Sequence, residues 1–204
     1  MLVFDHLVVS ATALDQGVAE VEAALGLRLQ GGGQHVKMGT HNRLLHLGDI
    51  YLEVIARNPD LPRPDRPLWF DLDCFTGPAR PTVWVTRTED LEADLAASPP
   101  GIGTPIPMER NGFSWTVVVP DSGILPFDNS CPALIQWDEG SPHPVDRLID
   151  IGVRLARLEV QTPHAAALAG ALQGRFHDPR VVIVAGPETA MRATFSTPHG
   201  LRVL

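Results

Sequence analysis

The sequence predicts an α+β fold built from repeated β-α-β-β-β modules. Two observations support this class. Short strand-like runs of apolar and β-branched residues surround single amphipathic helices, and the order of one strand, one helix and three strands begins again twice along the chain. With 204 residues, 44% of them hydrophobic, the chain can bury a core without disulfides or a structural metal.

The first predicted module covers residues 1–57. Residues 2–9 are apolar and rich in valine, which predicts a strand. A helical pattern then begins near Thr12 and stops at Gly26, a residue type that often ends helices. Three further strands are predicted over residues 29–36, 40–47 and 51–55.

A connector over residues 58–79 separates this module from the next, because four prolines between positions 59 and 67 prevent regular structure. The second module covers residues 80–144, with a helix that begins at Thr88. The turn-forming residues of the segment 127–132 predict an irregular insertion before its last strand. Its strands are predicted over residues 82–86, 105–109, 114–119 and 133–137.

A third, shorter β-α-β-β-β-like module is predicted over residues 145–204. Thr162-Pro163 indicates the start of its helix and Gly174 the end. Its strands are predicted over residues 155–161, 181–184, 191–196 and 201–204.

Charge and composition exclude some classes of binding partner and predict where in the cell the protein is located. The net charge of −8 gives no basic surface for nucleic acid or anionic lipid. The apolar N-terminus is short and lacks a basic leader, so we expect neither a signal peptide nor a membrane span. The two cysteines, Cys74 and Cys131, show no CxxC spacing, which fits a reducing cytoplasm.

His6 and Glu53 are the candidates for chemistry in the first module. Strand alternation puts His6 on one face with Val8, and Glu53 on one face with Tyr51 inside an apolar run. A carboxylate buried there needs a cation, a proton or strong hydrogen-bond donors. Imidazole and carboxylate both suit first-row divalent ions, so the pair indicates half of a metal site.

A plainer interpretation of the same two residues is structural. Glu53 could pair with an arginine such as Arg43, and His6 could cap a sheet edge. The surrounding sequence decides between the metal half-site and this structural role.

Several segments in a fixed order form a recognisable pattern. In the first module they are Asp5-His6-Leu7-Val8-Val9, Gly31-Gly32-Gly33-Gln34-His35, Met38-Gly39-Thr40-His41-Asn42 and the run 47–56; in the second they are Arg110-Asn111-Gly112, Trp115, the run 134–138 and His143-Pro144. Together they resemble the glyoxalase-like domains of the vicinal oxygen chelate superfamily, over residues 3–144. The resemblance implies paired modules whose curved mixed sheets surround a central cleft, with helices on the outer faces.

The resemblance implies metal ligands on the first and last strand of each module. His6 and Glu53 match the first pair. In the second module the matching positions are Val83, which cannot bind a metal, and Gln136, whose neutral amide is a weaker ligand. The implied cofactor is a weakly held divalent ion (Zn, Mn, Fe or Ni) bound by His6, Glu53 and Gln136.

Other side chains are candidates for binding the ligand. His41 and His46 could complete the ligand set, although alternation puts them on opposite faces and each is more often a surface residue. Tryptophans of the second module could line an apolar pocket. The expected substrate-binding residues are His41, Asn42, His46, Arg110, Trp115 and Trp137.

Two functions fit this sequence. The first is a metal-dependent lyase, isomerase or dioxygenase-type enzyme in which Glu53 is the catalytic residue and a small oxygenated molecule is the substrate. The second is a module of the bleomycin-resistance type that binds or sequesters a small molecule without turning it over. The sequence leaves open whether the modules pair within one chain or across a homodimer.

Overall fold

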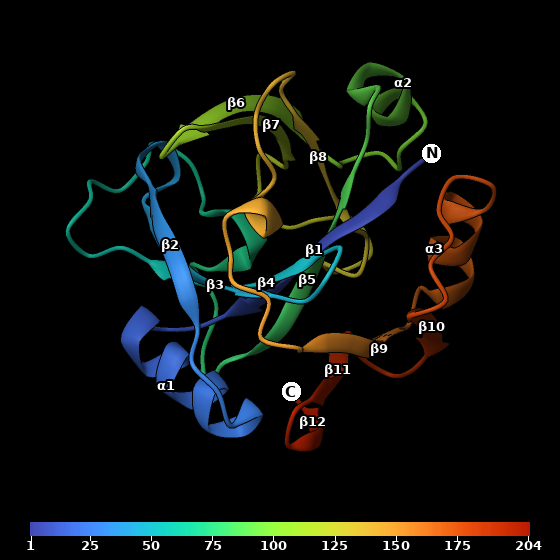
Figure 1. Cartoon of the computed structure of the whole chain (residues 1–204). Helices are drawn as coiled ribbons and strands as arrows, with labels where there is room; N and C mark the ends of the chain where they lie inside the picture. Colours follow the sequence, from blue (N-terminus) through green and yellow to red (C-terminus); the bar gives the residue numbers. More distant parts are fainter.

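The computed structural model describes residues 1–204 and contains two β-sheets and three α-helices (Figure 1). None of the helices is long and apolar enough to span a bilayer. The N-terminal elements form the first half of the large sheet and one helix. Gly26 ends this helix, as predicted, and adopts the left-handed conformation. These elements are β1 (Val3–Ser10), α1 (Leu14–Leu25), β2 (Gln30–His35), the 3-10 turn η1 (Val36–Met38), β3 (Thr40–His46) and β4 (Tyr51–Arg57).

The second half repeats this order after the proline-rich connector. The connector is irregular except for one 3-10 turn, η2 (Trp69–Asp71). The following elements are β5 (Arg80–Arg87), α2 (Leu91–Ala96), β6 (Thr104–Arg110), β7 (Phe113–Val119) and β8 (Ala133–Trp137). The segment 127–132 is irregular, as predicted, and Phe127, Asp128 and Asn129 have positive φ there.

The two halves form one eight-stranded sheet in the order β2-β3-β4-β1-β5-β8-β7-β6. In each half the first strand pairs in parallel with the last strand, β1 with β4 and β5 with β8. The two first strands, β1 and β5, are antiparallel neighbours with Leu7 opposite Trp84. The two halves are therefore related by an approximate twofold axis between β1 and β5, and the predicted α+β fold is confirmed.

The C-terminal segment follows the same order of elements but has a different strand order. Its sheet runs β10-β9-β11-β12, so the first strand lies beside the second and third rather than beside the last. In Figure 1 this sheet and α3 lie to one side of the large sheet. The elements are β9 (Arg154–Thr162), α3 (Ala165–Leu172), β10 (Val181–Ala185), β11 (Ala190–Thr197) and β12 (Gly200–Val203).

Both sheets share one hydrophobic core. A single cluster of 45 buried residues contains side chains from the large sheet and from the C-terminal segment. Trp84 is fully buried and packs edge-on against Phe176, with ring centroids 5.0 Å apart. The C-terminal sheet is thus held to the rest of the chain by apolar packing.

A segment that we call the strap (residues 138–153) connects β8 to β9. It includes the 3-10 turn η3 (Pro144–Asp146), which lies in front of the middle of the large sheet in Figure 1. Arg147 donates to the Asn111 carbonyl of the second half at 2.7 Å. Ile149 exchanges two hydrogen bonds with the side chain of Gln30 in the first half. The strap therefore joins both halves across one face of the sheet.

A β-bulge interrupts the pairing of β1 with β5 at Asp5. Phe4 lies opposite Thr86 and His6 lies opposite Val85, so Asp5 is the extra residue. Neighbouring side chains of a regular strand point to opposite faces, but a bulge re-aims them. The bulge accounts for the contact between the adjacent side chains of Asp5 and His6.

Candidate functional site

A cavity lies between the two halves of the large sheet, and about 30 Å³ of it is open to the centres of water-sized molecules. The residues that line it come from both halves and from the connector: His6, His35, Asn42, Tyr51, Glu53, Trp69, Phe70, Val85, Arg110, Trp115, Val117, Ile135 and Trp137.

Strand alternation explains most of this lining. Tyr51 and Glu53 on β4 are two positions apart and share the cavity face, as Ile135 and Trp137 do on β8. Residues between them, such as Leu52 and Gln136, point to the other face. The apolar strands thus position a few polar groups in a largely aromatic enclosure.

His6 and Glu53 meet, as the alternation predicted. They lie on the adjacent strands β1 and β4, and His6 Nε2 is 3.5 Å from Glu53 Oε2. Both side chains are buried. The His6 ring also stacks on the Tyr51 ring, with centroids 4.4 Å apart.

Buried charges set the protonation of this pair. Burial lowers the pKa of His6, but the carboxylates of Asp5 and Glu53 outweigh it and raise the pKa to about 9. Burial raises the pKa of Glu53, but the hydrogen bond from His6 and the other donors lower it to about 2. At neutral pH the pair is therefore an imidazolium beside a carboxylate.

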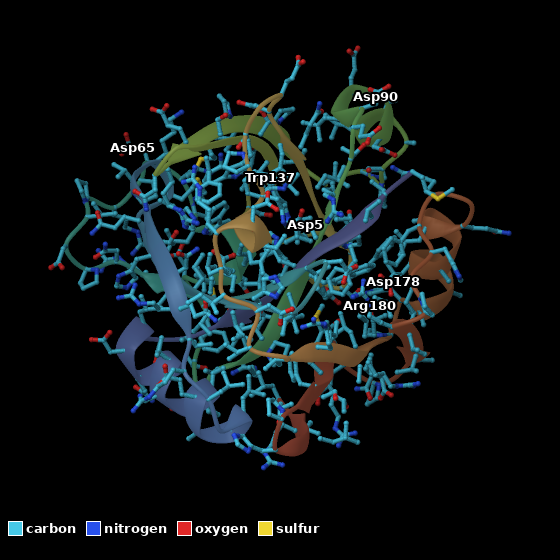
Figure 2. The ribbon with its side chains drawn as sticks, viewed as in Figure 1. Asp5, Asp65, Asp90, Trp137, Asp178 and Arg180 are labelled. Carbon is cyan, nitrogen blue, oxygen red and sulfur yellow. The ribbon has the colours of Figure 1, made fainter.

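Asp5 binds His6 on the side of the ring that faces away from Glu53. Its Oδ1 lies 2.6 Å from His6 Nδ1, and its Oδ2 accepts from Trp137 Nε1 at 3.0 Å and contacts His143 Nε2 at 3.1 Å. Figure 2 shows Asp5 and Trp137 together at the centre of the molecule. Asp5 is fully buried, and these donors hold its pKa well below the usual range although burial opposes them. His6 is thereby fixed with Nε2 directed to Glu53.

Asn42 links Glu53 to the second half. Its Nδ2 donates to Glu53 Oε1, and its Oδ1 accepts from Arg110 at 2.9 Å. Arg110 Nη1 also lies 2.8 Å from His35 Nε2. Burial and the charge of Arg110 lower the pKa of His35 to about 3, although Glu53 opposes them. His35 is therefore neutral and able to accept from Arg110.

Glycines make room for this arrangement. Gly32 has φ of 114°, and a Cβ there would lie 2.1 Å from the Asn42 carbonyl oxygen. A Cβ on Gly33 would lie 2.8 Å from the Arg110 side chain. The run Gly31-Gly32-Gly33 therefore lets β2 approach β3 and lets Arg110 reach the cavity.

The expected substrate-binding residues divide into two groups. Asn42, Arg110, Trp115 and Trp137 line the cavity. His46 shares the face of Asn42 but lies beyond the cavity, where it accepts from the Gly48 amide and lies 3.7 Å from Asp150. His41 is half-buried on the other face of β3. Neither histidine is in the lining, because alternation and distance along the strand separate them from Glu53.

Gln136 requires a correction to the expected ligand set. Its Oε1 accepts from the Leu91 amide and its Nε2 donates to the Glu89 carbonyl, so it binds the start of α2. Its neighbours Ile135 and Trp137 face the cavity, and alternation directs Gln136 away from it.

The second half presents apolar side chains to the cavity from its own first and last strands. Val85 on β5 lies opposite His6, and Ile135 and Trp137 face the cavity from β8. The resemblance implies metal ligands on these two strands, but none of these side chains can coordinate an ion.

The cavity residues do not fit a resident divalent ion. No three His, Cys, Asp or Glu side chains are grouped as metal ligands. His6 Nε2 and Glu53 Oε2 lie 3.5 Å apart and contact each other instead of facing a common ion position. The guanidinium of Arg110, held 2.8 Å from His35, adds a positive charge that opposes a cation.

Several residues of the site were not predicted. Asp5, His35 and His143 stand in the segments that carry the family resemblance, which was a signal for all three. Trp69 and Phe70 belong to the connector, where the prolines indicated only irregular chain. The contact of His143 with Asp5 joins positions far apart in sequence, so its role could not be predicted.

Comparison with known proteins agrees with this architecture. The family model of the glyoxalase-like domain matches residues 4–176. Comparison with curated protein sequences found no match. Among solved structures, a hypothetical protein from Staphylococcus aureus has a TM-score of 0.62 and 16% identity over 93% of this chain and 88% of that chain. This likeness concerns the fold.

Methylmalonyl-CoA epimerases are also similar, at a level too low to support an inference about function. The Streptomyces coelicolor epimerase in complex with 2-nitronate-propionyl-CoA has a TM-score of 0.45 and 14% identity, over 68% of this chain and 96% of that chain. The Mycobacterium tuberculosis enzyme has a TM-score of 0.43 and 13% identity, over 66% and 85% of the two chains.

Proposed function

Because the chain belongs to the glyoxalase-like domain family of the vicinal oxygen chelate superfamily, we propose that it binds a small oxygenated organic molecule in the cavity and moves a proton on it with Glu53. The observation that carries this proposal is the buried His6–Glu53 pair, 3.5 Å apart, in the cavity lined by both halves of the sheet. The two halves pair within one chain, and both contribute to the lining.

The chemistry follows from the charges of the pair. A ligand carbonyl oxygen that accepts a hydrogen bond from Nε2–H of His6 replaces Glu53 as the partner of the imidazolium, which raises the pKa of Glu53 toward a range useful for a base. Glu53 then takes a proton from the carbon next to the carbonyl. The electrons of the broken C–H bond form the C=C bond of the enolate, and the negative charge on its oxygen is stabilised by the imidazolium of His6. Return of the proton from Glu53 to carbon completes an exchange or isomerase-type step.

Asp5 supports the step by holding His6 in place. Its hydrogen bond at 2.6 Å to Nδ1 leaves Nε2 as the donor that faces the ligand. This mechanism uses the charge of His6 in place of a divalent ion, because the residues around Glu53 do not fit one.

Proton exchange with solvent tests the proposal. The protein is incubated in D2O with a panel of small ketones, aldehydes and 2-oxo acids, and deuterium at the carbon next to the carbonyl is measured by NMR. We expect exchange with a subset of the panel and its loss, by a factor of at least about 100, in Glu53→Gln. Gln136→Ala is the control, because Gln136 lies outside the cavity.

A metal-dependent reaction would give a different result in the same assay. Protein treated with a chelator should keep its exchange rate and its melting temperature. Loss of exchange on chelation, restored by a divalent ion, would contradict the metal-free step and return His6 and Glu53 to the role of ligands.

A second candidate is binding without turnover. Val85 and Ile135 favour it, because the first and last strands of the second half present apolar side chains to the cavity where the first half presents His6 and Glu53. In that case a ligand would bind in the cavity, Glu53→Gln would bind it too, and no compound of the panel would exchange.

A further inference from the structure

Two hydrogen-bond donors in the cavity lining lack an acceptor. Trp69 Nε1 and Arg110 Nε are buried atoms without a partner. Trp69 is 4% exposed and lines the cavity. A buried donor left without an acceptor destabilises a protein by about 1–3 kcal/mol. Such groups are retained when a ligand supplies the missing acceptor.

Both donors lie beside His35, on the side of Asn42 away from the acid–base pair. The Trp69 ring meets the His35 ring edge-on, with centroids 5.1 Å apart, and Arg110 Nη1 lies 2.8 Å from His35 Nε2. Asn42 links them to Glu53, since it donates to Glu53 and accepts from Arg110, and His35 Nε2 lies 3.9 Å from Glu53 Oε1. The cavity therefore has a donor end, at Trp69 and Arg110, directly next to a proton-transfer end, at His6 and Glu53.

Arg110 has a fixed position and no counter-ion. Its Nη1 is bound to two neutral acceptors, and its guanidinium lies 5.8 Å from the centre of the Trp115 ring. No carboxylate forms a salt bridge with it, whereas Glu53 already has His6 as its cation. A half-buried guanidinium without an acidic partner favours an anionic group of a ligand.

We infer that the ligand of this cavity is a small carboxylic acid whose carboxylate is held by Arg110 and Trp69. This inference rests on the proposed function only for the location of the ligand. The free Nε of Arg110 and Nε1 of Trp69 donate to the carboxylate oxygens, and the adjoining carbon faces His6 and Glu53. A small oxo acid has both the carboxylate for the donor end and the carbonyl for the proton-transfer end.

The size and chemistry of the cavity limit which carboxylic acids can bind. Only about 30 Å³ is open to the centres of water-sized molecules, so the cavity suits a small or flat molecule. Apolar walls from Val85, Val117 and Ile135 exclude a second charged group. A neutral amide of the same shape presents a donor where the lining needs an acceptor, so it is expected to bind poorly.

Tryptophan fluorescence provides the assay, because Trp69, Trp115 and Trp137 all line the cavity. The probes are matched pairs of an acid and its amide: acetate with acetamide, pyruvate with pyruvamide, and benzoate with benzamide. Wild-type protein should respond saturably to at least one carboxylate and at least tenfold more weakly to its amide, the scale of one charge-assisted hydrogen bond, about 1.5 kcal/mol or more.

Two variants locate the carboxylate. Arg110→Gln should weaken binding at least tenfold, and Trp69→Phe, which removes the indole N–H and keeps an aromatic ring, should weaken it to a smaller extent. Arg147→Gln is the matched control, since Arg147 is an exposed arginine of the strap and donates to a backbone carbonyl outside the cavity. Circular dichroism verifies the fold of each variant.

The outcomes separate this inference from the proposed function. Equal affinity for acid and amide, unchanged binding in Arg110→Gln, or no response to any carboxylate overturns the inference. Glu53→Gln should still bind the carboxylate, because it removes only the base. Carboxylate binding without deuterium exchange would therefore support the inference while contradicting proton transfer.

Discussion

Asp5 is fully buried and in contact with three side-chain donors, from His6, Trp137 and His143. An asparagine at this position would have only one acceptor oxygen, and its NH2 group, which is itself a donor, would face other hydrogen-bond donors. Asp5→Asn should therefore lower the free energy of unfolding by about 3–5 kcal/mol, the usual effect of breaking a buried charged pair. Urea denaturation measures the change.

Asp150→Asn provides the contrast for this variant. Asp150 pairs with Arg154 at 2.6 Å on the surface, where water and salt screen the interaction. Asp150→Asn should therefore lower the free energy of unfolding much less than Asp5→Asn does. If Asp5→Asn lowered the free energy of unfolding as little as Asp150→Asn does, the buried network around His6 would contribute nothing to stability.

The shifted pKa values predict how stability depends on pH. The pKa of His35 falls from 6.5 to about 3 and that of Glu53 from 4.5 to about 2, so the unfolded chain binds more protons in acid and stability falls as the pH drops below about 6.5. The pKa of His6 rises from 6.5 to about 9, so its contribution is complete below 6.5 and is lost as the pH rises toward 9. Stability should be highest near pH 6.5.

Urea midpoints between pH 3 and pH 10 test this profile. In His6→Gln the decline above pH 6.5 should become shallower, because the group that binds the extra proton in the folded state is absent. A midpoint that rises steadily to pH 9 in the wild-type protein would contradict the charged state of His6.

At the scale of single elements, α2 depends on a residue of β8. Gln136 accepts from the Leu91 amide at the first turn of the helix, and Asp90 accepts from the Ala93 amide. Gln136→Ala should lower the free energy of unfolding by about 1 kcal/mol, as removal of a helix cap does. It should leave carboxylate binding unchanged, and a loss of binding would show that Gln136 reaches the cavity after all.

The comparison of Gln136 with Glu53 shows how far the sequence could predict the structure. Apolar alternation was enough to identify the strands and to place His6 and Glu53 on one face, because both effects are local. The counterpart of Glu53 depends on the register of β8 against β5, which is set by packing between distant segments. For the same reason the sequence did not reveal Trp69 or His143, whose roles come from a loop folded onto the sheet.

The whole molecule should unfold in one step, because both sheets share a core. Phe195, on β11, is fully buried, and Phe195→Ala should lower the free energy of unfolding by about 3–5 kcal/mol. All four tryptophans lie outside the C-terminal segment, at positions 69, 84, 115 and 137. Tryptophan fluorescence reports on the large sheet, and circular dichroism reports on both sheets.

In Phe195→Ala the two signals should shift together to the same lower urea midpoint. A fluorescence midpoint that stays at the wild-type value while circular dichroism changes earlier would mean that the C-terminal sheet unfolds independently. The chain would then be two cooperative units.

The twofold relation between the halves has a consequence for how this protein can diversify. The first half carries His6 and Glu53, while the second half supplies apolar walls from Val85, Trp115, Val117, Ile135 and Trp137. Mutations in those walls can reshape the space for a ligand without touching the His6–Glu53 pair. Under the proposed mechanism the two copies therefore divide selectivity from reactivity, and new ligands can be acquired by drift in one copy while the other keeps the acid–base pair.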